Sequence, residues 1–346
     1  MRRALLALLA AAGGAVACGA GAPSTTDGQT PPALRRCVGT PFTPAPVEAW
    51  IHGTLTPLTV ALGAPNHSMQ DVLATPGGAA TMRGKFTYGS VSKDLEDEKV
   101  RVFLDACSGW TTLGDFRTDT DGRIAVPVPS SLAAGVYDVR LQVLGDGTLA
   151  PGRIWILPAG TRLAVSDIDG TLTTSDEELV VDVITDFFQP IYTGADVPNA
   201  YPGAAALTNA LVGRGHVVVF LTGRPYWLTG KTREWLSSGG FALGPLHVTD
   251  SNSEAIPSQD GVGAFKLAFL RSLTAAGFRL DEAYGNATTD VFAYAGAGIP
   301  ATATWIIGPN AGAGGTNAVT GSWEPRAAAV SALPPVTQPF TVPQTM

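Results

Sequence analysis

DIDGTLTTSD, residues 167–176, directly follows the apolar run Leu163–Ser166. An apolar run that is followed at once by Gly and Thr predicts a buried strand that ends in a tight loop. Asp167 and Asp169 therefore stand one residue apart at the carboxyl end of a strand, the edge at which open α/β sheets bind their ligands. Alternation along an extended chain points both carboxylates the same way. Two like charges placed so closely repel each other unless a cation lies between them.

The loop also supplies groups that suit an anionic ligand. A hard cation such as Mg²⁺ prefers carboxylate and carbonyl oxygens, so Asp167 and Asp169 are candidate metal ligands. Gly170 lets the backbone turn close to a bulky ligand, and Thr171 offers a hydroxyl and a backbone N–H to an anionic oxygen. The alternative is a solvated acidic turn, which the preceding apolar run argues against. A calcium-binding loop would need helices on both sides, and the strand contradicts it.

Strands and helices alternate from Arg162 onward, which predicts an α/β region with a doubly wound, mainly parallel sheet and helices on both faces. The predicted buried strands are Leu163–Ser166, Val217–Thr222, Pro245–Val248, Glu282–Gly285 and Thr302–Ile307. The predicted helices are Glu177–Phe188, Gly203–Gly213, Tyr226–Ser238, Val262–Ala276 and Thr289–Ala295. The interval between Asp176 and Val217 is too short for a separate lid domain, so we expect an open site.

The second predicted strand ends in polar residues at the same edge of the sheet. Thr222 can donate a hydrogen bond to a phosphoryl oxygen. The alternative interpretation is that Thr222 caps the N-terminus of the following helix, which is at least as common a role for a Thr before a helix. Gly223 and Arg224 follow directly, and we place them with Gly170 and Thr171 among the substrate-binding residues.

Two later segments complete the candidate site. Lys266 begins a helix, where a cation opposes the helix dipole unless an anion lies nearby; a plain surface lysine is the simpler interpretation. Asn286 and Asp290 follow the fourth predicted strand and are four residues apart, so both would face the site. With Asp167 and the Asp169 carbonyl they would complete an oxygen shell around Mg²⁺.

DIDGT, Thr222, Lys266 and GNATTD from Gly285, in this order on successive strand ends, resemble the haloacid-dehalogenase superfamily of phosphohydrolases. The resemblance implies that Asp167 attacks phosphorus and forms an aspartyl-phosphate. It implies that Asp169 protonates the leaving oxygen and then activates water. Thr222 and Lys266 join the catalytic set by the same resemblance. A carboxylate is a competent nucleophile when a metal neutralises the phosphate charge.

Longer stretches resemble the C-terminal catalytic domain of lipins, which are Mg²⁺-dependent phosphatidate phosphatases. They are DIDGTLTTSD, TREWLSSGGFALGPLHVTD from Thr232, FKLAFLRSL from Phe265 and AYGNATTDVFAYAGAGIP from Ala283. A related domain closes the membrane-associated phosphatidylinositol transfer proteins. The resemblance spans residues 163–307 and implies a haloacid-dehalogenase-like, lipin-type phosphatase domain over residues 162–308. The second motif differs from that of lipins, since it is LTGRP in this chain.

Residues 47–158 carry short apolar or alternating runs separated by turn signals, which predicts an antiparallel β-sandwich without helices. We find no cluster of His, Cys or acidic residues in it that calls for chemistry, and we expect the mixed charges of Asp94–Lys99 to form a solvated loop. The runs are Leu58–Leu62, Met82–Tyr88, Lys99–Asp105, Ile124–Val128, Tyr137–Leu144 and Arg153–Leu157.

The N-terminus carries a targeting signal. Arg2 and Arg3 precede an apolar stretch too short to span a bilayer, and Ala15-Val16-Ala17-Cys18-Gly19 resembles the lipobox of bacterial lipoproteins. Residues 1–18 are therefore a predicted lipoprotein signal with Cys18 acylated, and ordinary secretion is the alternative. Residues 19–46 are rich in Gly, Pro, Ser and Thr, which indicates a flexible tether.

The ends of the chain complete the domain plan. Residues 309–346 form a low-complexity tail, with a short helix expected near Glu324–Ala332.

If Cys18 carries lipid, Cys37 and Cys107 remain as an even pair in an oxidising compartment. A disulfide between them and two unpaired buried thiols are equally compatible with the sequence, because it gives no geometry.

Composition limits the functions that this chain can have. Its net charge of −7 argues against non-specific nucleic-acid binding, and its hydrophobic fraction of 45% allows sizeable cores. The favoured function is an exported, membrane-anchored Mg²⁺-dependent phosphatase for phosphatidate or a similar phosphomonoester. Two alternatives remain open: a non-catalytic lipid-binding surface lipoprotein, and a phosphatase for soluble or protein-linked phosphate.

Overall fold

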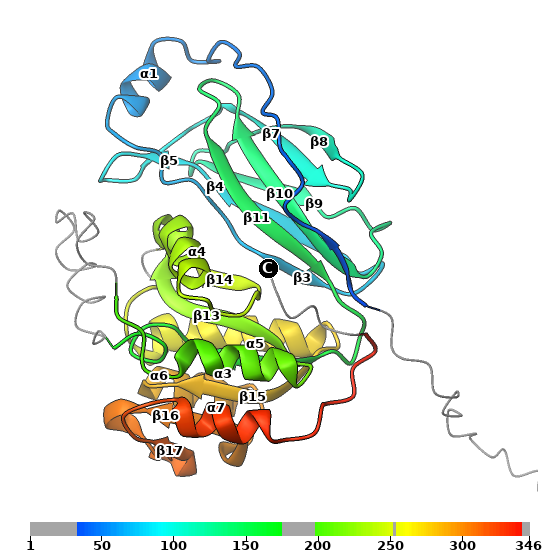
Figure 1. Ribbon diagram of the computed structural model, residues 1–346. Helices are drawn as coiled ribbons and strands as arrows, with labels where there is room; N and C mark the ends of the chain where they lie inside the picture. The colour runs from blue at the N-terminus through cyan, green and yellow to red at the C-terminus, as the bar shows by residue number, and fades with distance from the viewer. Residues whose placement is uncertain (1–32, 175–197, 252–253, 341–346) are drawn as a thin grey trace, which may run out of the picture. The chain divides into compact units, whose positions relative to one another are not determined.

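The chain folds into a β-sandwich region, residues 33–158, and an α/β region, residues 159–340 (Figure 1). The computed structural model describes residues 33–174, 198–251 and 254–340. The predicted signal, half of the predicted tether (residues 19–32) and the predicted helix Glu177–Phe188 lie outside these residues. Residues Pro32–Met346 cluster as one unit, so the contacts between the two regions lie within it. Among the described residues, no helix has the length and apolar character needed to cross a bilayer.

The α/β region is built on one six-stranded sheet whose neighbouring strands all run parallel. The strand order is β14-β13-β12-β15-β16-β17. The central part of β12 and the first five residues of β13 are apolar and buried, because both faces of a parallel sheet are covered. The strand bounds are β12 Arg162–Ser166, β13 Val217–Pro225, β14 Leu246–Thr249, β15 Arg279–Gly285, β16 Thr304–Ile307 and β17 Asn317–Val319.

Helices connect these strands in the order that the sequence predicts. From β12 the chain moves toward one edge of the sheet through β13 and β14, and later toward the other through β15 and β16. Since such connections are right-handed, α3 and α6 lie on opposite faces. The helix bounds are α3 Ala204–Gly213, α4 Thr229–Ser238, α5 Ala264–Ala275, α6 Thr288–Gly296 and α7 Glu324–Ser331. The carboxyl ends of the central strands therefore meet at one edge, between these layers.

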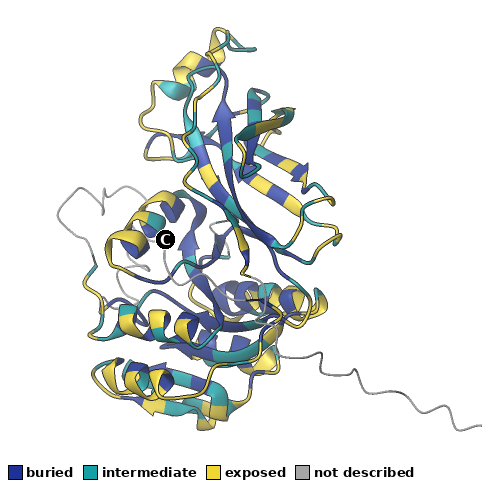
Figure 2. Cartoon of the chain, turned by 45° about the vertical axis from the view of Figure 1, so that its right-hand side comes forward, coloured by how far each residue is buried: buried dark blue, intermediate teal, exposed yellow. Residues whose placement is uncertain are grey.

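The sandwich region contains a six-stranded sheet, with the path β3-β11-β10-β7-β8 and β1 beside β10, and a three-stranded sheet β2-β4-β9. Buried residues of the central strands, such as Val102, Val139 and Leu141, form its core (dark blue in Figure 2). The strand bounds are β1 Arg35–Cys37, β2 Ser68–Met69, β3 Val72–Ala74, β4 Thr81–Lys85, β5 Thr87–Tyr88, β6 Lys93–Asp94, β7 Lys99–Asp105, β8 Trp110–Arg117, β9 Arg123–Pro127, β10 Gly135–Val143 and β11 Leu149–Ile156. The predicted β-sandwich is confirmed. It is not wholly antiparallel, because β1 pairs with β10 and β3 with β11 in parallel.

Two predictions for the sandwich were wrong in detail. The run Leu58–Leu62 was expected to be a strand, but it falls in and just after the helix α1, Leu55–Val60. The predicted solvated loop Asp94–Lys99 contains a buried carboxylate, because Glu98 is 2% exposed. Glu98 accepts hydrogen bonds from the backbone N–H groups of Ile51 and His52 and from the Thr56 hydroxyl. Glu98 thereby anchors the segment that leads into α1.

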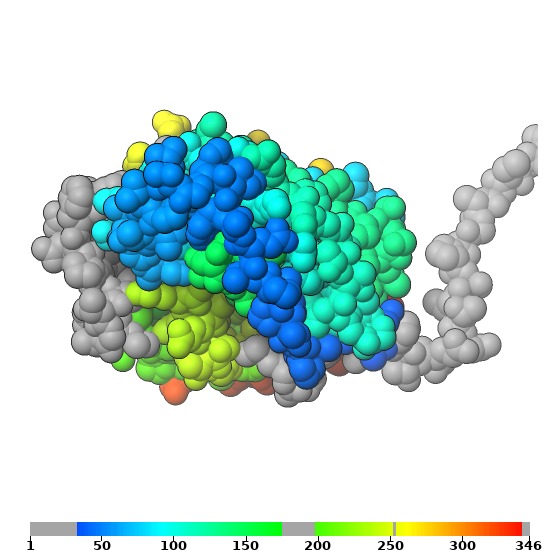
Figure 3. All heavy atoms as spheres, turned by 90° about the horizontal axis from the view of Figure 1, so that it is seen from above, coloured from blue at the N-terminus to red at the C-terminus, as the bar shows by residue number. Residues whose placement is uncertain are grey.

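Both ends of the described chain are more ordered than predicted. β1 lies inside the predicted tether and pairs with β10. Thr40 and Ala45 then make hydrogen bonds to sandwich side chains, and this stretch, drawn in blue, crosses the surface of the sandwich in Figure 3. At the other end, β17 adds an unpredicted strand to the sheet within the predicted low-complexity tail. The short helix expected near Glu324–Ala332 is confirmed as α7, which packs on α3.

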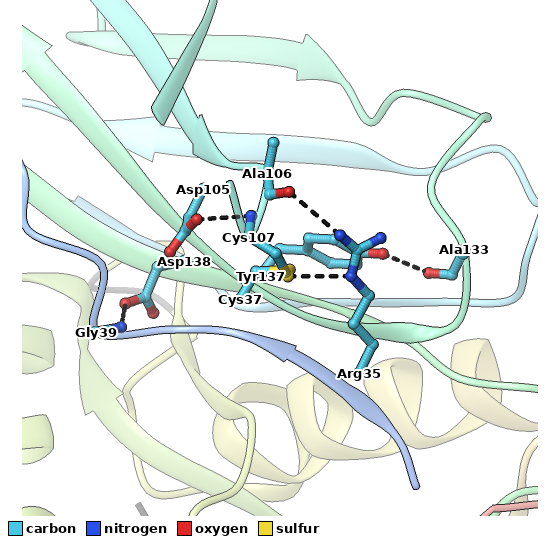
Figure 4. The surroundings of a disulfide bond; sticks show 9 residues. All are labelled: Arg35, Cys37, Gly39, Asp105, Ala106, Cys107, Ala133, Tyr137 and Asp138. Carbon is cyan, nitrogen blue, oxygen red and sulfur yellow. Dashed lines mark hydrogen bonds between the residues drawn. A yellow bond between two sulfur atoms is a disulfide. The ribbon is translucent and has the colours of Figure 1, made fainter. Parts of the chain in front are cut away.

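Cys37 and Cys107 form a disulfide (Figure 4). The sequence allowed either this disulfide or two unpaired thiols, and the disulfide is the state found. The bridge joins β1 to the turn after β7. The backbone N–H of Cys107 donates to Asp105, which helps to hold this turn at its positive φ of 67°. The disulfide thus fixes the N-terminal strand to the sheet.

Side chains of the sandwich cover the edge strand β14. The amide of Gln70 accepts from the backbone N–H of Val248 and donates to its carbonyl, as a neighbouring strand would. Asp71, with a fully buried side chain, accepts from the backbone N–H of Leu246 and from the Arg233 guanidinium. An uncovered sheet edge invites pairing with other chains, so these two residues join the regions and protect the edge.

We expect Asp71→Ala to lower the free energy of unfolding by about 3–5 kcal/mol, because it leaves Arg233 buried without its counter-charge. Asp115→Ala is the control, since the Asp115–Arg101 pair is exposed and should contribute about 1 kcal/mol or less. Urea denaturation of the two variants measures both values. Equal losses would show that the Asp71 contacts do not hold the regions together.

Candidate functional site

The loop after β12 is a tight turn at the carboxyl edge of the sheet. The carbonyl of Ile168 accepts from the backbone N–H groups of Thr171, Leu172 and Thr173. Gly170 has a φ of 68°, and a Cβ there would lie 2.0 Å from the Asn286 amide nitrogen. Only glycine satisfies both conditions. The predicted loop therefore forms, and it brings the DIDGT segment against the segment that follows β15.

Asp167 lies at the centre of this arrangement and is buried. Its Oδ1 accepts from Lys266 Nζ at 2.7 Å, and its Oδ2 accepts from the Thr171 hydroxyl at 2.9 Å. Lys266 Nζ also donates to Asp290 Oδ1 at 2.6 Å. The ammonium therefore sits between two carboxylates, and the simpler interpretation of Lys266 as a surface residue is wrong, since it is 3% exposed.

Burial and charge act against each other in this triad. Burial raises the pKa of the Asp167 carboxyl, Lys266 opposes that shift, and the carboxylates of Asp290 and Asp169 add to it. Burial alone would lower the pKa of Lys266, but Asp167 and Asp290 raise it above its usual value. With one cation and two carboxylates, the ionised triad has a net charge of −1. A further cation would be favoured beside it and an anion would not.

Asp290 binds two different groups, the Lys266 ammonium and the backbone at the start of α6. Its Oδ2 accepts from the backbone N–H groups of Asn286 and Ala287 at 3.0 and 3.1 Å. An acidic side chain at this position also suits the positive end of the helix dipole. Asn286 Oδ1 accepts from the Thr171 hydroxyl at 3.1 Å. The predicted grouping of Asp167, Asn286 and Asp290 is therefore found at one edge.

Asp169 has a different set of partners from those the sequence suggested. Arg224 Nε lies 3.0 and 2.9 Å from its two carboxylate oxygens, and Arg224 Nη2 lies 2.7 Å from Oδ1. The Thr222 hydroxyl donates to Oδ2 at 3.0 Å. Arg224 also donates to Thr232 and is 3% exposed. In this geometry Thr222 and Arg224 hold the second acid rather than project toward a substrate.

Close packing requires a glycine at position 223, between Thr222 and Arg224. A Cβ on Gly223 would lie 2.9 Å from a methyl carbon of Val262, in the segment that precedes α5. The glycine therefore lets that segment approach the end of β13. This contact places the start of α5, and with it Lys266, close to the loop after β12.

The oxygen donors at the edge suit a hard divalent cation. The Asp167 carboxylate, the Asp169 main-chain carbonyl and the Asn286 amide oxygen are the donor types that Mg²⁺ prefers. Asp290 fits this role less well, because its Oδ2 already accepts from two backbone N–H groups and its Oδ1 from Lys266. Each oxygen of Asp167 accepts a single hydrogen bond from the described residues and so keeps a lone pair for a cation. Within the described residues, no three His, Cys, Asp or Glu side chains are grouped closely enough to hold a metal by themselves.

Trp323 supports the loop from a part of the chain that the sequence did not connect with the site. It is fully buried, and its indole N–H donates to the Thr171 carbonyl at 2.7 Å. Its ring also packs edge-on against Tyr284 of β15. A single Trp in a segment rich in Gly, Ala and Thr gave a hint of burial, but nothing in its spacing pointed to this loop.

Comparison with known families agrees with this division of the chain. Residues 164–308 match the family model described as the LNS2 domain of PITM 1–3, and residues 65–156 match that of the PITM 1–3 β-sandwich domain. Membrane-associated phosphatidylinositol transfer protein 3 from Homo sapiens is 31% identical over 270 residues, which are 76% of this chain and 25% of that protein. Protein retinal degeneration B from Drosophila melanogaster is 30% identical over 270 residues, which are 76% of this chain and 20% of that protein.

The chain therefore spans about a quarter or less of the length of these relatives. In this chain the match to the β-sandwich model precedes the match to the LNS2 model. A carbohydrate acetylesterase from Xanthomonas citri covers 75% of this chain and 71% of its own, with a TM-score of 0.26 and 12% identity. That likeness is too weak to support a conclusion.

We expect Lys266→Met to lower the free energy of unfolding by about 3–5 kcal/mol, since it leaves two buried carboxylates facing each other. Adding Asp167→Asn to this variant should restore part of the loss, because it removes one of the unpaired charges. Lys99→Met, at an exposed ion pair with Glu48, is the control. Thermal and urea unfolding give the comparison, and a double variant no more stable than Lys266→Met would contradict the electrostatic account.

Proposed function

We propose that the α/β region is a Mg²⁺-dependent phosphomonoester hydrolase of the haloacid-dehalogenase superfamily, which acts on phosphatidate or a related phospholipid. The observation that carries the proposal is the position of Asp167. It lies at the carboxyl end of the central strand β12, with Lys266 and Thr171 each hydrogen-bonded to one of its oxygens and Asp169 two residues further on. A nucleophile, a second acid and a fixed cation at one strand end suit phosphoryl transfer.

In the first step, an oxygen of Asp167 attacks phosphorus and the bond from phosphorus to the ester oxygen breaks. The leaving oxygen takes the electron pair of that bond and a proton from Asp169. The Lys266 ammonium, 2.7 Å from Asp167, holds the nucleophile in place and offsets the negative charge that gathers there. The product of the step is an alcohol and an aspartyl-phosphate.

In the second step, Asp169 accepts a proton from water as the water oxygen attacks phosphorus. The bond from phosphorus to Asp167 breaks, which releases inorganic phosphate, restores the Asp167 carboxylate and leaves Asp169 protonated for the next cycle. Thr222 and Arg224 give Asp169 a defined orientation through four hydrogen bonds. A positioned acid or base typically contributes about 10²–10⁴-fold to the rate.

Mg²⁺ is part of the proposal because the triad of Asp167, Lys266 and Asp290 repels an anion. The Asp167 carboxylate, the Asp169 carbonyl and Asn286 would hold the ion, with Asp290 supporting Asn286 through its backbone. The bound ion would change the local charge from −1 to +1 and would neutralise charge on the phosphoryl oxygens. The donor types of these residues support this part of the proposal.

A phospholipid substrate is supported by relatives that are named as membrane-associated phosphatidylinositol transfer proteins.

We further propose that the protein is exported and anchored through Cys18. Residues 1–18, which include Cys18, lie outside the described residues. Anchoring would raise the local concentration of lipid head groups near the site. A secreted soluble protein is the alternative.

A second candidate function is non-catalytic phospholipid binding. It is favoured by the name of relatives such as membrane-associated phosphatidylinositol transfer protein 3, which describes transfer and no hydrolysis. The presence of Asp167, Asp169 and Lys266 in hydrogen-bonding geometry favours the enzyme in this chain. A phosphatase for soluble phosphoesters would use the same residues, so only the choice of substrate separates it from the first proposal.

Asp167→Asn should lower phosphate release from phosphatidate by at least about 10³-fold, because an amide cannot form the covalent intermediate. Wild type should lose activity in a chelator and regain it with Mg²⁺. The assay measures inorganic phosphate from phosphatidate, lysophosphatidate and a soluble ester, with Asp115→Asn as the control. Undiminished release by Asp167→Asn would contradict the mechanism, and binding of phosphatidate without any release would favour the non-catalytic function.

Cys18→Ser should move the protein from the membrane fraction to the soluble fraction. Activity on a soluble ester should stay unchanged, while activity on phosphatidate in membranes should fall because the enzyme is no longer held near its substrate. Fractionation followed by both assays measures these effects. A soluble wild type, or unchanged activity on membrane phosphatidate, would show that anchoring plays no part.

A further inference from the structure

A pocket of about 230 Å³ lies where the sandwich region meets the α/β region, away from Asp167. One wall comes from β10 and β11, and the other from α4, β13 and β14. Three arginines, Arg140, Arg153 and Arg233, line it together with apolar residues such as Phe220 and Leu243. Its volume is below the ~300–1,000 Å³ of pockets for drug-sized ligands, so only a small ligand fits.

The carboxylates near the pocket are already engaged. Asp138 accepts from Arg153 Nε at 3.0 Å and from the backbone N–H of Gly39 at 3.1 Å. Asp71 accepts from both terminal nitrogens of Arg233. The remaining acidic residue of the lining, Glu234, is exposed and solvated. The lining therefore has three arginines and two carboxylates, Asp138 and Glu234, and so a net positive charge. Asp105, which also acts on Arg140, is not among the residues that line the pocket.

The arginines keep hydrogen-bonding capacity that these carboxylates do not use. Arg140 Nη2 is 3.9 Å from Asp138, beyond hydrogen-bond distance, while Nη1 donates to a backbone carbonyl. Among the described residues, the side chain of Arg153 makes a hydrogen bond through Nε alone, and it is 26% exposed. The Nε of Arg233 is buried without a partner. One buried donor and the partly exposed donors of Arg140 and Arg153 favour an acceptor in the pocket.

The charges around Arg140 also favour an anion in the pocket. Burial lowers the pKa of its guanidinium; Asp138 opposes this shift, and the nearby Arg153 and Arg233 add to it. Arg140 also lies over the ring of Trp110, 5.3 Å from its centroid, which fixes the side chain without neutralising it. Like charges held this closely are stabilised when an anion lies between them.

We propose that this pocket is a second anion site, which binds a phosphate or phosphomonoester group between Arg140 and Arg153 of the sandwich and Arg233 of α4. Planar guanidinium groups match the oxygens of phosphate, often with two parallel hydrogen bonds. The anion would connect the two regions where Asp71 already joins them. The site is separate from the catalytic residues and does not depend on their activity.

The test measures binding of inorganic phosphate by titration calorimetry in a chelator, to wild type and to Arg140→Gln, Arg140→Lys and Arg153→Gln. Arg117→Gln, which removes an exposed charge from the same sandwich, is the matched control. Arg140→Gln and Arg153→Gln should weaken binding by about tenfold or more, as expected for a lost charge-assisted hydrogen bond. Arg140→Lys should keep part of the affinity, and Arg117→Gln should match wild type.

Hydrogen exchange with and without phosphate locates the site independently of these variants. Protection should appear in residues 135–156 and 229–246 and should persist in Asp167→Asn, which separates this site from the catalytic one. Vesicles of phosphatidylcholine with and without phosphatidate form the second arm. Loss of phosphatidate-dependent binding in Arg140→Gln would identify a lipid head group, while loss of phosphate binding alone would identify a soluble phosphate.

Three results would overturn the proposal. They are no phosphate binding at millimolar concentration, equal affinity in all the arginine variants, and protection confined to the loop at residues 166–173. Unfolding temperatures of the variants in the absence of phosphate show whether they are folded. If Arg153→Gln is unfolded because Asp138 is left unpaired, Arg140→Gln decides the outcome, since Arg140 makes no hydrogen bond to Asp138.

Discussion

A buried ammonium between two carboxylates is the interaction on which the catalytic edge depends. Lys266 comes from α5, Asp167 from the end of β12 and Asp290 from α6, so one cation ties three elements together. Replacing such a triad with apolar residues can stabilise a protein, which makes its presence a poor argument for stability alone. A charged group kept in a buried site is better explained by chemistry, and the net negative charge that remains explains why a metal ion belongs in the proposed mechanism.

Around this triad, hydrogen bonds from neighbouring residues fix the position of each reacting group. Thr171 is fixed through its carbonyl by Trp323, and its hydroxyl reaches both Asp167 and Asn286. Asp169 is held by Arg224, which is itself held by Thr232 of α4. Catalysis requires reacting atoms to be placed within a few tenths of an ångström, and rigid supporting contacts supply that accuracy. α4 also lines the pocket with Arg233, so one helix contacts both the catalytic edge and the junction with the sandwich.

The sequence predicted the sheet well where long apolar runs are bounded by Gly or Pro, as at β12 and β13, because burial on both faces leaves a clear pattern. It failed where that pattern is missing. β8 was not predicted, since Trp110–Arg117 is an edge strand with few buried residues. The run at Leu58–Leu62 was taken for a strand because a six-residue helix leaves too little sequence to show its period. The residues around Asp167 could be predicted from strand ends, but the Asp169–Arg224 pair joins positions 55 residues apart, and only the fold brings them together.

The central claim is that Asp167 becomes phosphorylated during the reaction. The most direct test uses the Asp169→Asn variant, in which hydrolysis of the intermediate should be slow. Brief incubation with phosphatidate and Mg²⁺, acid quenching and mass spectrometry of the peptide that contains Asp167 would detect a phosphoryl group on that residue. We predict that this adduct accumulates in Asp169→Asn and is absent when Asp167 is also replaced by Asn. Release of phosphate without any adduct on the Asp167 peptide would contradict the account.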